Sequence, residues 1–268
     1  MLKVTIAALI CLMLWNCGPQ GKANSEGVAG LANMERPGVK PTPIDTTELK
    51  YLMGKFNPKQ DPNFVAVLPV HADQAGRYIR KEAYDAFIKM YEAAKADGIH
   101  LIIKSATRNF DYQKGIWERK WTGQTKLSSG EDASKAYIAA TDRATNILKY
   151  SSMPGTSRHH WGTDIDLNNF NNAWFEKGEG LKLFTWLEAH ASTYGFCRPY
   201  TAKDNARPDG YNEEKWHWSY MPVSQKLTDL AEAVMEDEML QGFMGSEVAP
   251  ELDVVRKYVL GVNHGCRH

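Results

Sequence analysis

The pattern of apolar and polar residues predicts a mixture of helices and strands after residue 45. Apolar side chains recur at helical spacing over residues 81–97, and this stripe ends at Asp97-Gly98. The β-branched, apolar run Ile99–Ile103 predicts a buried strand. Further helices are predicted over 109–121, 131–150, 181–194 and 223–236, and further strands over 162–167 and 216–220. Because these elements do not alternate as regular βαβ units, we expect an α+β fold with a small antiparallel sheet flanked by helices.

The first 17 residues have the pattern of an export signal. Lys3 is the only charge before the apolar run Val4–Trp15, which is too short to span a bilayer comfortably. Cys17 follows at once and resembles the lipidated cysteine of bacterial lipoproteins. We therefore expect an exported protein of the bacterial cell envelope, anchored by lipid at Cys17 and facing the periplasm or the cell surface. The alternative is plain secretion with an ordinary cysteine.

Composition divides the rest of the chain into three parts. Residues 18–45 are rich in Gly, Pro, Asn and Ser, which predicts a flexible tether. A folded catalytic domain is expected over 46–236, followed by a helical extension over 237–268 with breaks at Gly242, Gly245 and Pro250. Cys11 lies in the signal and Cys17 would carry lipid, so Cys197 and Cys266 remain as an even pair that could form a disulfide after export.

The overall charge points away from one class of function. Lys+Arg and Asp+Glu both number 32, and the 268-residue chain has no basic run. A neutral chain of this kind gives no support for nucleic-acid binding. Its 43% hydrophobic and 24% charged residues are ordinary for a globular protein.

Two short clusters carry metal-ligating side chains. In the first, His159 and Asp166 lie on either side of Gly162, and a turn there followed by a strand would let both face one point. In the second, Glu214 and His217 are three apart, so a bend is needed before they can share a site. Two histidines and one carboxylate leave a fourth metal position open, as catalytic zinc requires. Spacing alone is weak support for either cluster.

Taken together, these motifs resemble the VanY-type D-alanyl-D-alanine carboxypeptidases, a family related to lysostaphin-like enzymes and the hedgehog signalling domain. The pattern Ser-x-His-x-x-Gly-x-x-x-Asp is matched by Ser157, His159, Gly162 and Asp166, and the pattern Glu-x-Trp-His by Glu214, Trp216 and His217. A looser motif, an Arg followed by a Gln, is matched by Arg108 and Gln113. The resemblance covers about residues 80–225.

The resemblance implies a role for each matched residue. It implies one Zn²⁺ per chain, held by His159, Asp166 and His217, with Glu214 as general base and then acid. It also implies that Arg108 pairs with a free peptide carboxylate, whereas Gln113 and Ser157 add hydrogen bonds. Trp216 is expected to pack beneath the site.

Two positions depart from the family pattern. Thr107 stands where the family often has Tyr, and Asp164 stands where a small residue is common. Asp164 lies two residues from Asp166, so it shares the same strand face and is a rival metal ligand on spacing alone. The motif register favours Asp166.

The resemblance implies an enzyme that removes the terminal D-alanine from peptidoglycan stem peptides. Three alternatives remain open: an L,D-carboxypeptidase, an endopeptidase that cuts cross-links, and a zinc-bearing binding module without catalysis. Arg108 favours action on a free chain end, and Glu214 favours catalysis. Stem peptides are the expected partners, together with the membrane through the lipid anchor.

Overall fold

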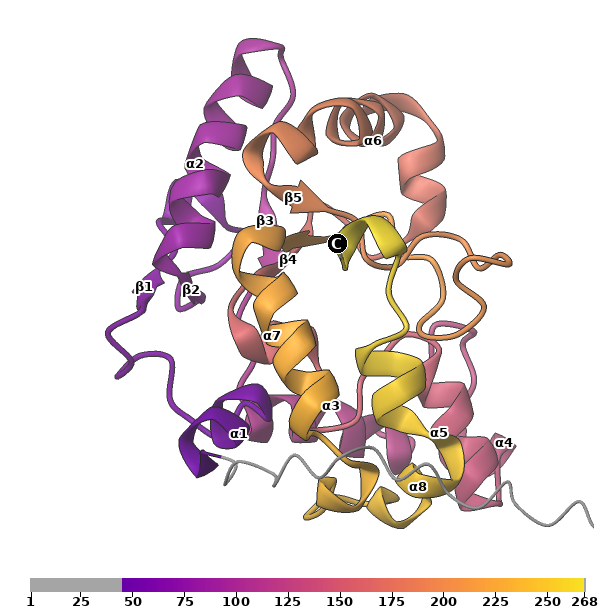
Figure 1. The fold of residues 1–268 in the computed structure, drawn as a ribbon. Coiled ribbons are helices and arrows are strands. Elements are labelled where there is room, and N and C mark those ends of the chain that lie inside the picture. The colour runs from indigo at the N-terminus through magenta and orange to yellow at the C-terminus, as the bar shows by residue number, and fades with distance from the viewer. Residues whose placement is uncertain (1–44, 268) are drawn as a thin grey trace, which may run out of the picture. The chain divides into compact units, whose positions relative to one another are not determined.

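In residues 45–267, the part of the chain that the computed structural model describes, eight α-helices flank two small antiparallel sheets (Figure 1). The helices are α1 (Thr46–Leu52), α2 (Lys81–Ala96), α3 (Phe110–Trp121), α4 (Ala133–Ala136), α5 (Ala140–Leu148), α6 (Gly178–His190), α7 (Met221–Val234) and α8 (Ala249–Leu252). The strands are β1 (Phe64–Ala66), β2 (Tyr78–Arg80), β3 (Ile103–Ser105), β4 (Asp164–Leu167), β5 (Phe196–Cys197) and β6 (His217–Tyr220). The predicted α+β class is confirmed.

Single turns of 3₁₀-helix connect many of these elements. They are η1 (Pro69–His71), η2 (Arg158–Trp161), η3 (Asn172–Glu176), η4 (Ala191–Tyr194), η5 (Asp237–Met239), η6 (Ser246–Val248) and η8 (His264–Cys266), with a π-helical turn, η7, at Val255–Val259. The turn η2 matters most for function, because it leads directly into β4 through Gly162.

The larger sheet has the strand order β3-β4-β6-β5, so segments far apart in the sequence become neighbours. All of its pairings are antiparallel. In the register of β4 with β6, Asp166 lies opposite His217 and Asp164 lies opposite Ser219. The two sequence clusters with metal-ligating side chains therefore meet at the centre of this sheet.

Alternation along β4 gives the sheet one apolar and one polar face. Ile165 and Leu167 are fully buried in an apolar cluster shared with α2 and α6. Asp164 and Asp166 point the other way because successive strand residues alternate between faces. Burying side chains such as Ile165 and Leu167 contributes roughly 1.5–3 kcal/mol each, and this fixes which face the carboxylates occupy.

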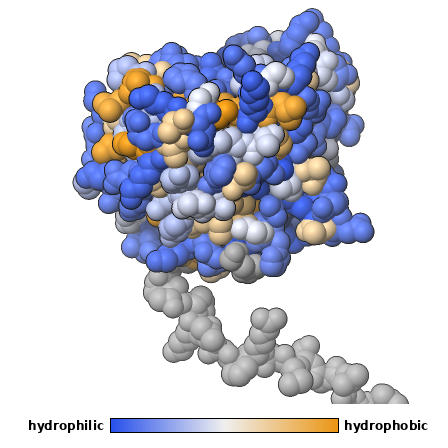
Figure 2. Space-filling view, turned by 90° about the horizontal axis from the view of Figure 1, so that it is seen from above, coloured by the Kyte–Doolittle hydropathy of each residue, from blue (hydrophilic) through white to orange (hydrophobic). Residues whose placement is uncertain are grey.

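A second apolar cluster covers the polar side of the sheet. Its residues come from α1, α3, α5, α7 and residues 235–262, most of which lie below the sheet in Figure 1, whereas α2 and α6 lie beside and above it. The outer surface seen from above is mostly hydrophilic, with scattered hydrophobic residues (Figure 2). The polar groups of β4 and β6 thus lie between two apolar clusters, where water has little access.

The predicted helix over 109–121 is confirmed as α3, and its N-terminal cap explains where it begins. The Asn109 side chain accepts a hydrogen bond from the backbone N–H of Tyr112 at 3.0 Å. The helix over 81–97 is likewise confirmed as α2, and it ends where Gly98 takes a left-handed φ of 74°. The helices predicted over 181–194 and 223–236 correspond to α6 with η4 and to α7.

The strand predicted over 99–103 is wrong in its position, because β3 begins only at Ile103. Its partner strand β4 ends at Leu167, which pairs with Ile103. Beyond Leu167 the strand pairing stops, and the backbone N–H of Ile102 donates to the side chain of Asn168 at 3.1 Å instead of to a strand carbonyl. Leu101 is nevertheless fully buried. The apolar run therefore predicted a core segment correctly, although most of it forms no strand.

The single helix predicted over 131–150 is also wrong, since the structure divides it into α4 and α5. Tyr137 has an extended backbone with φ −128° and ψ 99°. Arg143 of α5 donates hydrogen bonds to the carbonyls of Tyr137 and Ser134, at 2.9 and 3.3 Å. These bonds satisfy carbonyl groups that the interruption leaves without a helical partner, so the break is stabilised from within the segment.

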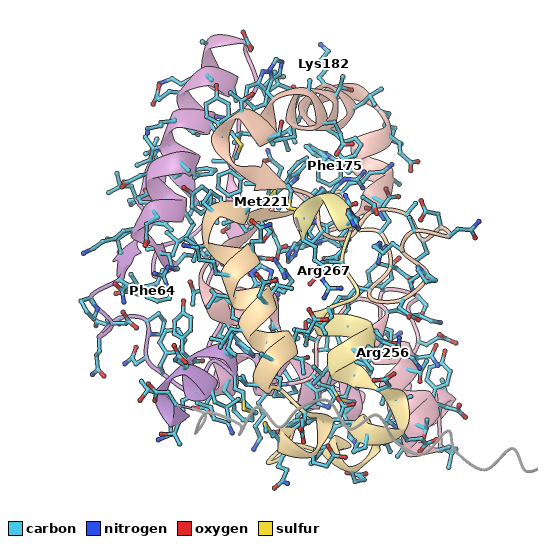
Figure 3. All side chains as sticks on the ribbon, viewed as in Figure 1. Phe64, Phe175, Lys182, Met221, Arg256 and Arg267 are labelled. Atoms are coloured by element: carbon cyan, nitrogen blue, oxygen red, sulfur yellow. A yellow bond between two sulfur atoms is a disulfide. The ribbon has the colours of Figure 1, made fainter. Side chains whose placement is uncertain are left out.

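The C-terminal segment packs along α7. Cys266 forms a disulfide with Cys197 of β5. Gln225 of α7 donates to the Arg267 carbonyl at 3.0 Å, and Figure 3 shows Arg267 beside α7. Upstream, Leu240, Phe243, Val255 and Val259 belong to the apolar cluster on the polar side of the sheet. Pro250 lies in the first turn of α8, a position that suits proline, so it begins a helix there instead of breaking one.

Replacing Gly162 tests how much the close packing of the turn before β4 contributes to stability. It has a φ of 71°, and a Cβ placed there would lie 2.2 Å from Cε1 of Phe64. Gly98 has a similar φ of 74° but nothing within 4 Å. We expect Gly98→Ala to lose about 1–2 kcal/mol of unfolding free energy and Gly162→Ala to lose roughly 1–3 kcal/mol more through overpacking. Urea unfolding measures both, and equal losses at the two sites would show that the contact with Phe64 is unimportant.

Candidate functional site

The three predicted metal ligands come together on the polar face of the larger sheet. His159 lies in η2, Asp166 in β4 and His217 in β6. One ligand atom from each lies within 4.8 Å of the others, and all three side chains are buried. The left-handed turn at Gly162 allows His159 and Asp166 to face the same point, as the sequence indicated.

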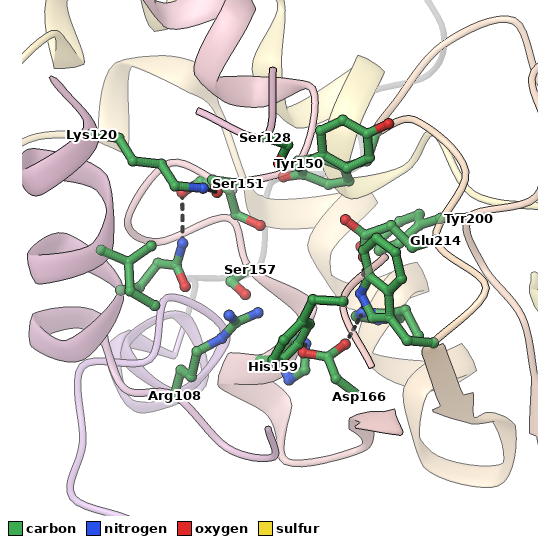
Figure 4. Close-up of a pocket in the computed structure, with 17 residues that line it drawn as sticks. Arg108, Lys120, Ser128, Tyr150, Ser151, Ser157, His159, Asp166, Tyr200 and Glu214 are labelled. Carbon is green, nitrogen blue, oxygen red and sulfur yellow. Dashed lines mark hydrogen bonds and ion pairs between the residues drawn. The ribbon is translucent and has the colours of Figure 1, made fainter. Parts of the chain in front are cut away.

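The hydrogen bonds around this triad leave specific atoms free for a metal. The Nδ1 of His159 lies 2.8 Å from the Ala106 carbonyl, to which it donates, so Nε2 faces Asp166 with 3.3 Å between Nε2 and Oδ2. The Nδ1 of His217 lies 3.0 Å from Oδ1 of Asp166. The two imidazole rings are nearly perpendicular, with centroids 4.7 Å apart. Figure 4 shows His159 and Asp166 side by side at the pocket.

The protonation preferences of the triad suit a divalent cation. Burial lowers the pKa of His159, and the charge of Arg108 lowers it further, so its imidazole is neutral. Burial would raise the pKa of Asp166, but contact with the two histidines holds it well below its usual range. His159 Nε2 and Asp166 Oδ1 are buried and have no hydrogen-bond partner. Two imidazoles and a carboxylate are a donor set that zinc favours, so these residues fit such an ion.

Asp164 lies on the opposite side of His217. Its Oδ2 is 2.8 Å from Nε2 of His217, whereas Nδ1 faces Asp166. The imidazole therefore stands between the two carboxylates. Burial would raise the pKa of Asp164, but the charge of Arg158, 3.2 Å away, keeps it well below the usual range. Asp164 shares the strand face with Asp166 but contacts His217 through Nε2, the ring nitrogen that faces away from Asp166.

Glu214 reaches the triad through the bend that the sequence required. The backbone N–H of His217 donates to the Glu214 carbonyl at 3.3 Å, which closes a turn just before β6. The Oε2 of Glu214 then lies 3.5 Å from Nδ1 of His217. Burial raises the pKa of Glu214 to about 8, and the charge of Asp166 acts in the same direction. This carboxyl can therefore accept or release a proton near neutral pH.

A cavity of about 290 Å³ opens beside these residues and receives the other predicted side chains. Arg108, Gln113 and Ser157 all line it. Figure 4 shows the guanidinium of Arg108 directed towards Ser157. The Nε of Arg108, the Oγ of Ser157 and the Oε1 of Gln113 are buried without hydrogen-bond partners, so the wall of the cavity presents polar groups that a ligand could satisfy.

Comparison with known proteins identifies the family. Residues 76–223, more than half of the chain, match the family model described as VanY: D-alanyl-D-alanine carboxypeptidase. The chain belongs to this family. The matched residues contain the triad, Glu214 and the three side chains of the cavity wall.

Relatives of this chain include two proteins that are named as carboxypeptidases. A D-alanyl-D-alanine carboxypeptidase of Enterococcus faecalis is 28% identical over 134 residues, which cover 50% of this chain and 45% of the relative. YodJ of Bacillus subtilis, named as a carboxypeptidase, is 32% identical over 148 residues, covering 54% and 47%. This chain therefore spans about half the length of these curated relatives.

Solved structures of similar proteins are more distant. VanYB in complex with D-alanine-D-alanine is 22% identical with a TM-score of 0.47, covering 69% of this chain and 91% of that one. The LD-carboxypeptidase LdcB is 23% identical with a TM-score of 0.47, covering 78% and 81%. A VanY D,D-pentapeptidase mutant in complex with Zn(II) is 24% identical with a TM-score of 0.44, covering 66% and 86%.

Two residues of the site escaped the sequence analysis. Lys120 lines the cavity, where its Nζ donates to Ser151 Oγ at 2.5 Å. A signal for it existed, because Gln113, Ile116 and Lys120 follow helical spacing along α3 and all line the cavity. Arg158 is fully buried beside Asp164, and no pattern in the sequence indicates that contact.

Three tryptophans near the site are buried. Trp117 and Trp121 are buried and stacked, with ring centroids 6.0 Å apart, in the apolar cluster below the sheet. Trp216 is buried and lines the cavity, and its ring centroid lies 6.4 Å from that of Tyr150 and 6.1 Å from that of Phe170. These rings therefore shape the cavity wall and the core beneath it.

Acidity should weaken metal binding through His217. Burial opposes a charge on this ring, but its hydrogen bond to Asp164 and its close contact with the Asp166 carboxylate raise its pKa to about 9. The metal-free imidazole is thus protonated at neutral pH and must release a proton when Nδ1 binds a metal. We expect zinc affinity to fall about tenfold for each unit of pH below this pKa, since one proton is displaced.

Zinc titration against a competing chelator, from neutrality up to the pKa of His217, measures this dependence. Glu214 can add a second proton to the exchange, so the Glu214→Gln variant isolates the contribution of His217. Affinity in that variant that does not change with pH would contradict the expectation.

Proposed function

We propose that this protein is a zinc-dependent D,D-carboxypeptidase that hydrolyses the terminal D-Ala-D-Ala bond of peptidoglycan stem peptides. The observation that carries the proposal is the single cavity that unites His159, Asp166, His217 and Glu214 with the unpartnered polar groups of Arg108, Gln113 and Ser157. One wall can hold a metal, and the other can hold the end of a peptide. Family membership supports the same reading.

His159 Nε2, an oxygen of Asp166 and His217 Nδ1 would hold the zinc ion. When bound there, zinc supplies polarisation of the scissile carbonyl and a lower pKa for the attacking water. The residues themselves exclude bulk water, since all three ligands are almost completely buried. Electrostatic interactions are stronger in such a site than in open solvent.

Glu214 is the group that moves protons. Its carboxylate takes a proton from the attacking water and passes it to the nitrogen of the leaving amine. A pKa of about 8 in the metal-free protein suits a group that must do both in one cycle. Its separation of 3.5 Å from His217 Nδ1 keeps it beside the ligands.

Arg108 and its neighbours select a free chain end. The guanidinium offers a fork of N–H donors that matches a carboxylate, and the Ser157 hydroxyl adds one more donor. Gln113 donates through Nε2 to the Ser152 carbonyl at 2.8 Å, which turns its Oε1 towards the cavity as an acceptor for a substrate N–H. An endopeptidase would have no carboxylate to place there.

Export and lipid anchoring at Cys17 remain proposals from the sequence, because residues 1–44 lie outside the described part of the chain. Within the described part, none of the helices has the length and apolar character needed to cross a membrane. A peptidase of this family that acts on peptidoglycan would require export.

Digestion of purified muropeptides with the zinc-loaded protein tests the proposed reaction. Mass spectrometry should show a pentapeptide stem that loses one alanine and stops at the tetrapeptide. Shortening of the tetrapeptide would indicate the L,D-carboxypeptidase instead, and separation of cross-linked stems would indicate the endopeptidase. If none of these substrates changes, the enzyme proposal fails and the zinc-bearing binding module is favoured.

Replacing Glu214 should separate catalysis from metal binding. We expect Glu214→Gln to lower kcat by about 10²–10⁴-fold, the usual contribution of general acid–base catalysis. Zinc content should stay unchanged, because Glu214 is not one of the three ligands. Release of D-alanine and zinc stoichiometry are measured on the same sample, and a variant that keeps wild-type kcat would exclude Glu214 as the base.

Replacing Arg108 should remove the preference for a free carboxylate. For peptides ending in a carboxylate, we expect Arg108→Ala to lower kcat/KM about 10–100-fold, as for loss of a hydrogen bond between charged groups worth about 1.5–3 kcal/mol. Peptides ending in an amide should be affected little. Lys120→Met is the matched control, because it removes the other cation of the cavity. If only the Lys120 variant loses the preference, the carboxylate binds there and not at Arg108.

A further inference from the structure

His217 is held between two carboxylates, one on each ring nitrogen. Nδ1 lies 3.0 Å from Asp166 and Nε2 lies 2.8 Å from Asp164. The two acids occupy alternate positions of β4, and His217 stands opposite them on β6. This arrangement goes beyond the proposed ligand set, because Asp164 contacts the nitrogen that faces away from the metal cluster.

Asp164 is built into a buried network of its own. It accepts hydrogen bonds from Thr163 Oγ1 at 2.7 Å, Ser219 Oγ at 2.7 Å and Arg158 Nε at 3.2 Å. The remaining guanidinium nitrogens of Arg158 donate to Thr228 Oγ1 at 2.8 Å and to Ser219 Oγ at 2.9 Å. The side chains of Arg158 and Asp164 are both 0% exposed.

The charge of Arg158 allows Asp164 to remain a carboxylate in this interior. A lone buried carboxylate would be strongly disfavoured, whereas a paired and fully hydrogen-bonded one is tolerated. The guanidinium also lies over the Trp161 ring, 4.5 Å from its centroid. Asp164 is thus a fixed anionic acceptor that cannot turn away from His217 without leaving Arg158 unpaired.

We propose that Asp164, balanced by Arg158, is a positioning residue that keeps the Nε2–H tautomer of His217 and aims Nδ1 at the metal. A carboxylate behind a metal-binding imidazole fixes the ring and raises its basicity. Arg158 precedes the proposed ligand His159, and Asp164 lies two residues before the proposed ligand Asp166. The same short segment therefore contributes two ligands and the pair of side chains that orients His217.

Zinc affinity and the state of the imidazole test this role. We expect Asp164→Asn to weaken zinc binding about 10–100-fold, the usual effect of losing such a partner. The double variant Arg158→Met/Asp164→Ala should weaken it similarly although it leaves no unpaired buried charge. Affinity is measured by chelator competition, and the cobalt-substituted protein should show a changed visible spectrum in both variants.

Thr228→Val is the matched control, because it removes a partner of Arg158 without touching Asp164 or His217. It should lower the melting temperature yet leave zinc affinity within about twofold of wild type, since zinc affinity depends here on the partners of the ligand. If Thr228→Val loses zinc affinity as strongly as the Asp164 variants, the hydrogen bonds around Arg158 and Asp164 affect zinc binding only through the stability of the fold.

Nitrogen NMR of His217 in the zinc-loaded wild type tests the proposed tautomer directly, even if a variant fails to fold. We expect a protonated Nε2 with a strong hydrogen bond, and an unprotonated Nε2 would overturn the proposal. So would a folded double variant with wild-type affinity. The inference rests on the proposed metal site, and the two fail differently: wild type that binds no zinc refutes the site, whereas unchanged binding in the variants refutes only the role of Asp164.

Discussion

The pairing of β4 with β6 is the constraint on which the rest of the site depends. It places Asp166 opposite His217 and Asp164 opposite Ser219, while Ile165 and Leu167 enter the apolar cluster shared with α2 and α6. A slip of one residue would exchange the two faces, because strand side chains alternate. Burial of the apolar residues therefore opposes such a slip, and the same force that stabilises the core determines which side chains can meet a metal.

That register also concentrates charge where water is scarce. Asp164, Asp166 and Glu214 are all buried, which is unfavourable unless each anion is compensated. Arg158 compensates Asp164 directly, and the two carboxylates on β4 share the imidazole of His217. Glu214 has only a longer contact with that ring, 3.5 Å from Nδ1, and burial raises its pKa. Glu214, whose negative charge is the least compensated by neighbouring cations, is thus the acid proposed to exchange protons. Asp164 and Asp166 stay ionised, because their neighbours keep the pKa of each well below its usual range.

The sequence predicts features that depend on local residues, and it misses features that depend on contacts formed only in the fold. Periodicity located α2 and α3 because their stripes and caps are local properties. It misplaced β3, whose start depends on where β4 ends, and it missed the break at Tyr137, which Arg143 stabilises through folded contacts. The triad was predicted because its members lie in two short motifs, each of which matches the family pattern. For Asp164, spacing gave the correct strand face, but only the structure shows that an imidazole from another strand stands between it and Asp166.

Hydrogen bonds to main-chain carbonyls tie Arg108, the proposed carboxylate anchor, to the segment of the proposed metal ligand His159. Arg108 N–H donates to the His159 carbonyl at 3.2 Å, His159 Nδ1 to the Ala106 carbonyl at 2.8 Å, and His160 Nδ1 to the Arg108 carbonyl at 2.6 Å. Burial lowers the pKa of His160 to about 3, so this ring stays neutral and keeps its bond. The spacing between the two segments is therefore held by one main-chain hydrogen bond and by two buried imidazole rings bonded to main-chain carbonyls. A fixed spacing of this kind favours one distance between a chain end and the bond to be cut, which supports an enzyme that removes residues from the end of a peptide.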